Sequence, residues 1–103
     1  HVFETFVVGE VIKSYLNAGG DARNVHFYRD ARQREIDLII QEGRVLPPVE
    51  IKTAATVTRE TTAGFSVLND IGDYDLGAGA VICQTREAYP LTADVEAVPV
   101  WSI

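Results

Sequence analysis

The chain has 103 residues, 47% of them hydrophobic, and carries a formal net charge of −6. This length and apolar content predict a single compact domain, residues 1–103, that buries a substantial core. The acidic balance argues against simple, non-specific nucleic-acid binding, because phosphate contacts require lysine and arginine.

A helix and two strands are predicted in the first 40 residues. The helix covers Val2–Asn17 and ends at the glycine pair that follows, a common C-terminal stop. Aromatic and β-branched residues then predict a strand at Val25–Arg29. A polar turn at 31–34 leads to a second strand, Glu35–Ile40.

The rest of the chain adds a second helix and further strands. Residues 48–52 form the third predicted strand, and Thr58 is placed to cap a helix that runs to about Ile71. A glycine-containing loop then leads to a strand at 80–84. A last strand, expected at the edge of the sheet, covers 98–103 and is interrupted by a proline.

Three charged residues, Asp37, Glu50 and Lys52, lie on two apolar predicted strands. Because successive side chains of a strand face opposite ways, Glu50 and Lys52 should share a face. By the same alternation Asp37 should share a face with Ile39 and lie opposite Ile36. Two carboxylates about 4 Å apart repel by roughly 4 kcal/mol at an effective dielectric near 20. The pair is kept only if a cation bridges the acids, if one stays protonated, or if water reaches both.

The chemistry of these three residues fits a metal-assisted phosphodiester site. Mg²⁺ prefers oxygen ligands and is commonly held by one or two carboxylates together with waters and substrate phosphates. A lysine beside the metal can orient the attacking water or offset the charge that builds on phosphate. Asp37, Glu50 and Lys52 are therefore the first candidate catalytic residues.

The turn between the two strands leaves two registers open. A simple hairpin centred on Gly43 places Asp37 opposite Val49. One extra residue, bulged at the prolines 47–48, instead places Asp37 opposite Glu50. Either register makes the two acids neighbours.

The first predicted helix carries two acids in different surroundings. Glu4 lies between the valines three, four and seven positions further on, which belong to the apolar face. Glu10 has polar residues at the same offsets and is expected to form a surface pair with Lys13. Glu4 is therefore the better candidate for a third acid at the site. The alternative is that it is a helix-start residue favoured by the macrodipole.

Two further features concern the compartment and the parent protein. The single cysteine, Cys83, excludes an internal disulfide and lies in an apolar run, where we expect a buried structural thiol. No run of about 18 apolar residues and no charged-then-apolar leader is present, so we expect neither a membrane span nor a secretory signal. These features predict a cytoplasmic domain. The absence of methionine, even at position 1, predicts a domain cut from a longer protein.

The order of the charged segments resembles a known pattern. An acidic helix, a strand with Asp37 and a strand with the Glu50-Ile51-Lys52 motif occur in the restriction-endonuclease-like core of the PD-(D/E)XK nuclease superfamily. Ile36 stands where that pattern often has proline. More narrowly, nearly the whole chain resembles the C-terminal domain of unknown function that follows a P-loop, AAA+-like ATPase module in many prokaryotic proteins. The segments that carry the narrower resemblance are residues 3–7, 27–30, 35–38 and 49–52.

The resemblance implies a fold and a set of site residues. The fold is α/β (α+β), with the order αβββαβ and a central mixed sheet of four to five strands flanked by helices. Asp37, Glu50 and the backbone carbonyl of Ile51 would bind Mg²⁺ or Mn²⁺, and Lys52 would position the attacking water. Glu4, or alternatively Glu10, matches the acid of the first helix.

Two functions of different class follow from the resemblance. In the first, the domain is a Mg²⁺-dependent nuclease, a hydrolase that acts on DNA and is attached to the ATPase module of the same chain. In the second, it is a catalytically inactive nuclease-fold module that binds a partner or nucleic acid for the ATPase. Nucleases of this type often use two active sites, so an oligomer is a further expectation.

A small-molecule enzyme of Rossmann type is disfavoured, because no G-x-G-x-x-G follows a predicted strand. No G-x-x-x-x-G-K-[ST] is present either, so ATP is expected to bind outside these residues. An arginine cluster surrounds the first predicted strand and either lies near the site or forms a solvated hairpin tip. Its members are Arg23, Arg29, Arg32 and Arg34.

Overall fold

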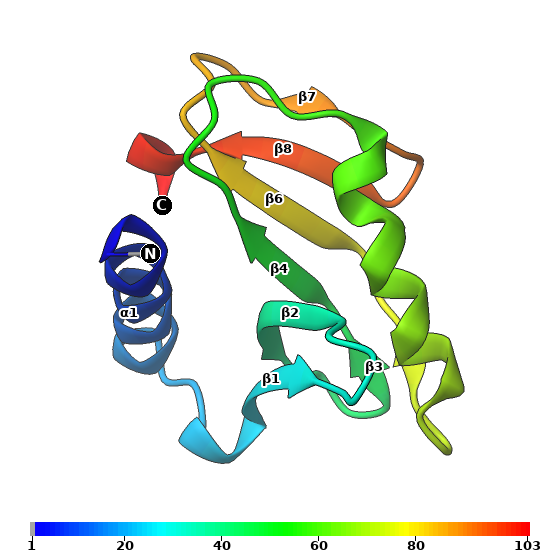
Figure 1. The fold of residues 1–103 in the computed structure, drawn as a ribbon. Helices are drawn as coiled ribbons and strands as arrows, with labels where there is room; N and C mark the ends of the chain where they lie inside the picture. Colours follow the sequence, from blue (N-terminus) through cyan, green and yellow to red (C-terminus); the bar gives the residue numbers. More distant parts are fainter. Residues whose placement is uncertain (1) are drawn as a thin grey trace.

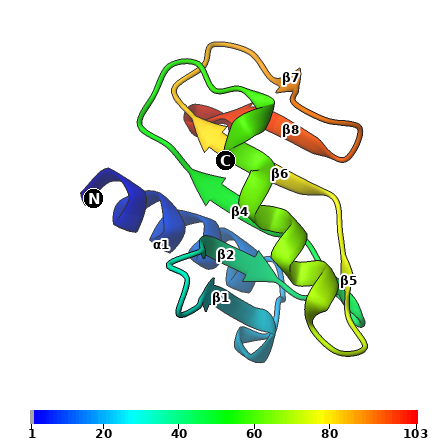
Figure 2. The same ribbon diagram turned by 45° about the vertical axis from the view of Figure 1, so that its right-hand side comes forward.

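The computed structural model describes residues 2–103 and places a central sheet between two helical layers (Figures 1 and 2). Helix α1 (Val2–Asn17) covers one face, and the 3₁₀ helix η2 (Arg59–Asp70) covers the other. Two shorter 3₁₀ turns are η1 (Ala22–Asn24) and η3 (Val100–Ser102). The strands are β1 (Val25–Arg29), β2 (Glu35–Ile40), β3 (Val45–Leu46), β4 (Pro48–Ile51), β5 (Asp75–Leu76), β6 (Gly79–Cys83), β7 (Tyr89–Pro90) and β8 (Val95–Pro99).

Six of these strands form one mixed sheet in the order β1-β2-β4-β6-β8-β7, while β3 and β5 pair separately. β1, β2 and β4 are antiparallel neighbours, β4, β6 and β8 run parallel, and β7 is antiparallel to β8. The domain is therefore a compact α+β structure with a mixed sheet, as predicted in coarse terms. The sheet described over residues 2–103 has one strand more than the upper limit expected.

Each face of the sheet has its own apolar cluster. Under α1, Val7 packs with Ile51 and Ile82. Under η2, a larger cluster includes Phe65 and Leu68. Because both faces of the central strands are covered, their sequences read as nearly continuous apolar runs. Cys83, at the end of β6, is fully buried, which confirms the expected structural thiol.

The N-terminal elements begin and end where the sequence predicted them. Helix α1 ends at a glycine pair in which Gly19 has φ +97°, a left-handed conformation that favours glycine. The amide of Gly20 closes the helix by donating to the carbonyl of Tyr15 at 2.9 Å. None of the helices formed by residues 2–103 has the length and apolar character needed to cross a bilayer.

Helix η2 lies where the second helix was predicted, but it begins differently. Thr58 occupies the N-cap position, yet its side chain makes no capping hydrogen bond, so that part of the prediction is wrong. Its backbone carbonyl instead accepts from the Thr61 amide at 3.0 Å, an i to i+3 bond typical of a 3₁₀ helix. The 3₁₀ start thus takes the place of the side-chain cap.

The last strand begins earlier in the chain, and lies further inside the sheet, than predicted. β8 lies between β6 and β7, so it is not an edge strand. Ala97, in the middle of β8, has no exposed surface. The strand ends at Pro99, which cannot donate a ladder hydrogen bond, and residues 100–102 turn into η3. The edge is taken by β7, whose two residues carry too little pattern for prediction.

Tyr89 in β7 ties the loop after β4 to the sheet edge. Its hydroxyl accepts from the Val57 amide at 2.9 Å and donates to the Val57 carbonyl at 2.7 Å. Val57 is buried, so Tyr89→Phe should leave two backbone groups without their partner and lower the free energy of unfolding by roughly 1–3 kcal/mol. Urea denaturation measures this loss. Tyr74→Phe, at an exposed tyrosine, is the control, and equal stability of the two variants would contradict the role given to Tyr89.

Candidate functional site

Strands β2 and β4 bring the two predicted acids together. The antiparallel ladder pairs Leu38 with Val49. Continued by one step, this register sets Asp37 directly opposite Glu50. Beyond the paired positions, side chains rather than backbone carbonyls accept the hydrogen bonds between the strands.

This register is set by the turn. Glu42 and Val45 bond to each other in both directions, with N···O distances of 2.9 and 3.0 Å, around Gly43 at φ +62°. A two-residue loop of this kind already places Asp37 opposite Glu50. Of the two predicted registers, the one that sets Asp37 opposite Glu50 is therefore confirmed, and the one that sets Asp37 opposite Val49 is wrong. The confirmed register needs no bulge at 47–48, because Ile39 pairs directly with Pro48.

A bulge does occur, but in β2 where it pairs with β1. Opposite Phe27, strand β2 places two residues, Asp37 and Leu38, instead of one. The extra residue breaks the alternation, so Ile36 and Ile39 both join the core under η2. The prediction that these isoleucines lie on opposite faces is wrong. Bulges re-aim side chains and are common next to active sites, and this one lies at Asp37.

Each acid accepts a hydrogen bond from a backbone amide of the opposite strand. The Ile51 amide donates to Asp37 Oδ2 at 2.8 Å, and the Asp37 amide donates to Glu50 Oε1 at 3.3 Å. These bonds satisfy amides at the point where the regular ladder stops. They use one oxygen of each carboxylate, Asp37 Oδ2 and Glu50 Oε1.

Lys52 completes the cluster. Its Nζ lies 3.7 Å from Glu50 Oε2, which confirms that Glu50 and Lys52 share a face. The Lys52 side chain is 47% exposed and that of Glu50 only 16%, so the ammonium lies at the surface and the carboxylate beneath it. The predicted juxtaposition of two acids and a lysine is therefore present. Their catalytic role stays a prediction.

The environment of Glu50 opposes its ionisation. Burial, and next the negative charge of Asp37, raise the pKa of Glu50 to about 7. The Asp37 amide and the Lys52 ammonium act in the opposite direction but do not cancel the rise. A carboxyl of this kind exchanges a proton near neutral pH, and its anion is stabilised by any cation that reaches it.

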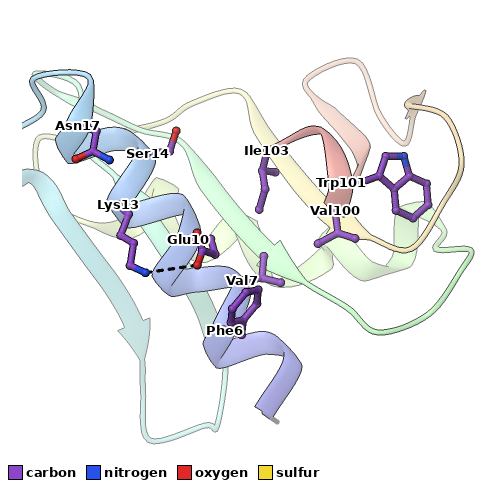
Figure 3. A pocket seen from close by; sticks show the side chains of 9 residues that line it. All are labelled: Phe6, Val7, Glu10, Lys13, Ser14, Asn17, Val100, Trp101 and Ile103. Carbon is purple, nitrogen blue, oxygen red and sulfur yellow. Dashed lines mark hydrogen bonds and ion pairs between the residues drawn. The ribbon is translucent and has the colours of Figure 1, made fainter.

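The two acids of α1 lie in different places, as predicted. Lys13 Nζ is 3.5 Å from Glu10 Oε1, which confirms the surface pair (Figure 3). Both residues line a groove of about 530 Å³ between α1 and the C-terminal residues, which include Trp101. No member of the Asp37–Glu50–Lys52 cluster lines that groove. Glu10 therefore lies in different surroundings from the Asp37–Glu50–Lys52 cluster.

Glu4 faces the interior of the domain. Its Oε1 atom is buried, on the side of α1 that also carries Val7. Within residues 2–103, however, no three His, Cys, Asp or Glu side chains lie close enough to hold one metal ion. Among these residues Glu4 therefore does not form a three-acid group with Asp37 and Glu50.

The donor set of the cluster is compatible with Mg²⁺. One or two carboxylates, with the remaining positions taken by water and phosphate oxygens, are a common set for this ion. The oxygens of Asp37 and Glu50 supply that minimum, and a bound cation would offset the burial and the charge of Asp37 that raise the pKa of Glu50. The carbonyl of Ile51 belongs to the same strand as Glu50.

Three members of the arginine cluster, Arg23, Arg29 and Arg34, form local ion pairs. Arg34 Nε lies 2.8 Å from Asp30 Oδ2, and Arg29 Nε lies 3.2 Å from Glu35 Oε1. Arg23 pairs with its neighbour Asp21 at 2.7 Å. The Arg29–Glu35 and Arg34–Asp30 pairs both lie within the β1–β2 hairpin. This favours the interpretation of the cluster as a solvated hairpin tip over a role at Asp37 and Glu50.

Gln84 is a residue near the site that the sequence did not single out. Its side-chain amide donates to the Thr53 carbonyl at 2.9 Å, and its backbone amide donates to the Ala54 carbonyl at 3.0 Å. These bonds fix the chain just after Lys52. A glutamine directly after an apolar strand was the only sequence signal for this role.

The comparisons with known proteins identify the family of the chain. The model of a family described as a domain of unknown function (DUF4143) matches residues 1–103. No curated protein and no solved structure is significantly similar to the chain. Because the family match covers the whole sequence, the chain belongs to the DUF4143 family.

Proposed function

We propose that this domain is a Mg²⁺-dependent phosphodiesterase that cleaves DNA. The observation that carries the proposal is the meeting of Asp37, Glu50 and Lys52 where β2 and β4 stop pairing, with the pKa of Glu50 raised to about 7. A carboxyl whose pKa is raised this far beside a second carboxylate is typical of a functional site, and a bound cation would stabilise both anions. The restriction-endonuclease-like core is part of this proposal.

The residues would have distinct roles. Asp37, Glu50 and the backbone carbonyl of Ile51 would hold Mg²⁺. When bound, the ion would supply a water of lowered pKa and neutralise charge on the phosphate. Lys52, exposed above Glu50, would orient that water toward phosphorus and stabilise the developing negative charge. Glu4 would act through water from the buried face of α1.

The proposal includes a larger setting for the domain. A P-loop ATPase module of AAA+ type would precede it in the same chain, and both would act in the cytoplasm. The ATPase would supply the movement along DNA, or the separation of its strands, that a small acidic domain cannot provide alone. ATP would bind to that module, because residues 1–103 contain no P-loop motif.

Lys52→Ala tests the proposal directly. We expect this variant to lose Mg²⁺-dependent cleavage of DNA by at least 100-fold, because the positioned ammonium at the attacking water is removed. Cleavage of single- and double-stranded DNA is measured by gel electrophoresis, with the isolated domain and with the chain that includes the ATPase module.

Lys13→Ala is the matched control. It removes another exposed lysine that pairs with a glutamate, and we expect cleavage to be unchanged. Circular dichroism should show the same fold in both variants. Equal cleavage by the wild type and Lys52→Ala would remove the catalytic claim.

The alternative is a catalytically inactive nuclease-fold module that binds a partner or nucleic acid for the ATPase. A specific observation favours it: Asp37 and Glu50 already bind backbone amides and so have a structural role without any metal. The net charge of −6 also favours a protein partner over DNA. Titration with Mn²⁺ separates the two functions, because an active site must bind the ion in a manner that depends on Asp37 and Glu50.

A further inference from the structure

Two loops meet beyond the ends of the parallel strands β4 and β6 (Figures 1 and 2). One comprises residues 52–58 and connects β4 to η2, and the other comprises residues 84–88 and connects β6 to β7. Together with Arg59, the first residue of η2, they form one surface, which we name the carboxyl-edge surface. Because Lys52 is its first residue, this surface adjoins the candidate site.

Hydrogen bonds fix the two loops against each other at both ends. At the end nearer the site, the backbone amide of Gln84 donates to the Ala54 carbonyl at 3.0 Å, and its side chain donates to the Thr53 carbonyl at 2.9 Å. At the other end, the Tyr89 hydroxyl bonds to both the amide and the carbonyl of Val57. The side chains of the two loops therefore belong to one continuous surface.

The carboxyl-edge surface is cationic in an acidic molecule. The whole chain has 9 lysines and arginines against 15 aspartates and glutamates. The surface has three cations, Lys52, Arg59 and Arg86, against one acid, Glu87. The rest of its first loop consists of threonines, alanines and one valine. The net charge of −6 therefore arises from other parts of the chain and does not exclude an anionic ligand here.

Both arginines of the surface are unpaired. Arg59 and Arg86 are exposed, and within residues 2–103 neither side chain forms an ion pair or a hydrogen bond. Even the acids that directly follow them in the chain, Glu60 and Glu87, do not pair with them. Four other arginines do pair with carboxylates: Arg23, Arg29, Arg34 and Arg44. The donors of Arg59 and Arg86 are therefore available to a ligand.

Unpaired guanidinium groups beside a proposed phosphodiester site favour phosphate as the ligand. The planar fork of a guanidinium matches the oxygens of a phosphate, and the hydroxyls of threonines commonly contact the same groups of DNA. We propose that a DNA strand bound at Lys52 continues along the carboxyl-edge surface, where Arg59 and Arg86 bind its phosphates. The choice of DNA rests on the proposed function, whereas the unpaired cations and the joined loops are features of the fold.

The salt dependence of DNA binding tests this proposal. The probe is a short fluorescein-labelled oligodeoxythymidylate, and its binding to the 103-residue chain is followed by fluorescence anisotropy without Mg²⁺, between about 0.02 and 0.2 M salt. We expect the double variant Arg59→Ala with Arg86→Ala to bind about tenfold more weakly at the lowest salt. The slope of log Kd against log salt should fall by about 1.4, because each phosphate contact to a single strand contributes about 0.7.

The double variant Arg23→Ala with Arg44→Ala is the matched control. It removes the same charge from two exposed arginines that lie outside the surface, in η1 and just before β3. We expect it to keep the slope of the wild type. An equal loss in both double variants would show an effect of overall charge and would overturn the proposal. An unchanged slope in Arg59→Ala with Arg86→Ala would also overturn it.

Two further measurements complete the test. A polyglutamate peptide of the same length should bind more weakly than the oligonucleotide, and equal or tighter binding would identify an acidic protein segment as the ligand instead. No saturable binding of the oligonucleotide would overturn the proposal as well. Because Mg²⁺ is absent, the outcome does not depend on cleavage. A chain that binds DNA through Arg59 and Arg86 but does not cleave it would support this proposal and contradict only the catalytic one.

Discussion

Glu50→Gln is expected to make the domain more stable at pH 8, by up to roughly 3 kcal/mol. The pKa of Glu50 is raised from its ordinary value of 4.5 to about 7, because of burial and the charge of Asp37. Each unit of such a rise corresponds to about 1.4 kcal/mol between the two protonation states. Glutamine keeps an oxygen that can accept from the Asp37 amide but carries no charge.

The dependence on pH distinguishes this effect from ordinary repacking. Because the folded pKa is raised, the folded state binds more protons than the unfolded state between about pH 4.5 and 7. The wild type therefore loses stability as pH rises through this window, whereas Glu50→Gln does not. Between pH 5.5 and 8 the advantage of the variant should grow by roughly 2 kcal/mol. Thermal and urea denaturation at both pH values measure it, above the isoelectric point of about 4.7.

Glu10→Gln is the matched control for this experiment. Glu10 is an exposed glutamate paired with Lys13, and its replacement should change stability by only a few tenths of a kcal/mol at either pH. A Glu50→Gln variant that is less stable than the wild type at pH 8 would show that the carboxylate is held by its hydrogen bonds and by Lys52. The unfavourable ionisation of Glu50 on which the proposed function rests would then be absent.

Local sequence signals were sufficient for the elements that position the site. The glycine pair after α1 and the apolar runs of β1 and β2 are short-range features, and the structure has those elements with the predicted bounds. The pairing of Asp37 with Glu50 was also accessible, because the two strands are joined by a turn that contains Gly43. The sequence left open two registers of β2 and β4 that differ by one residue. The hydrogen bonds between Glu42 and Val45 in the turn decide between them.

The missed features depend on contacts between distant segments. The bulge at Asp37 arises from pairing with β1, and no pattern within β2 reveals it. β8 lies inside the sheet because β7 pairs with it, and β7 has only two residues. A pocket lined by Tyr28 and Tyr74 forms only when the loop that carries Tyr74 reaches β1. Side-chain alternation along one strand cannot predict such arrangements.

Metal affinity provides the second large expected effect. If the cluster holds a divalent ion, the association constant for Mn²⁺ should rise about tenfold per pH unit up to about pH 7 and then level off. The reason is that Glu50, with its pKa near 7, must release one proton before its carboxylate can bind the ion. Calorimetric titration between pH 5.5 and 8.5 measures the slope and the position of the plateau.

Two variants make this titration specific to the cluster. Asp37→Asn removes the second cause of the raised pKa, so the remaining affinity should be weaker and its plateau should begin at a lower pH. Glu50→Gln should lose both the affinity and its pH dependence, while Glu10→Gln should match the wild type. Mn²⁺ binding that is unaffected by Asp37→Asn and Glu50→Gln would place the ion elsewhere. The two carboxylates would then serve only to hold the ends of β2 and β4 together through the amides of Asp37 and Ile51.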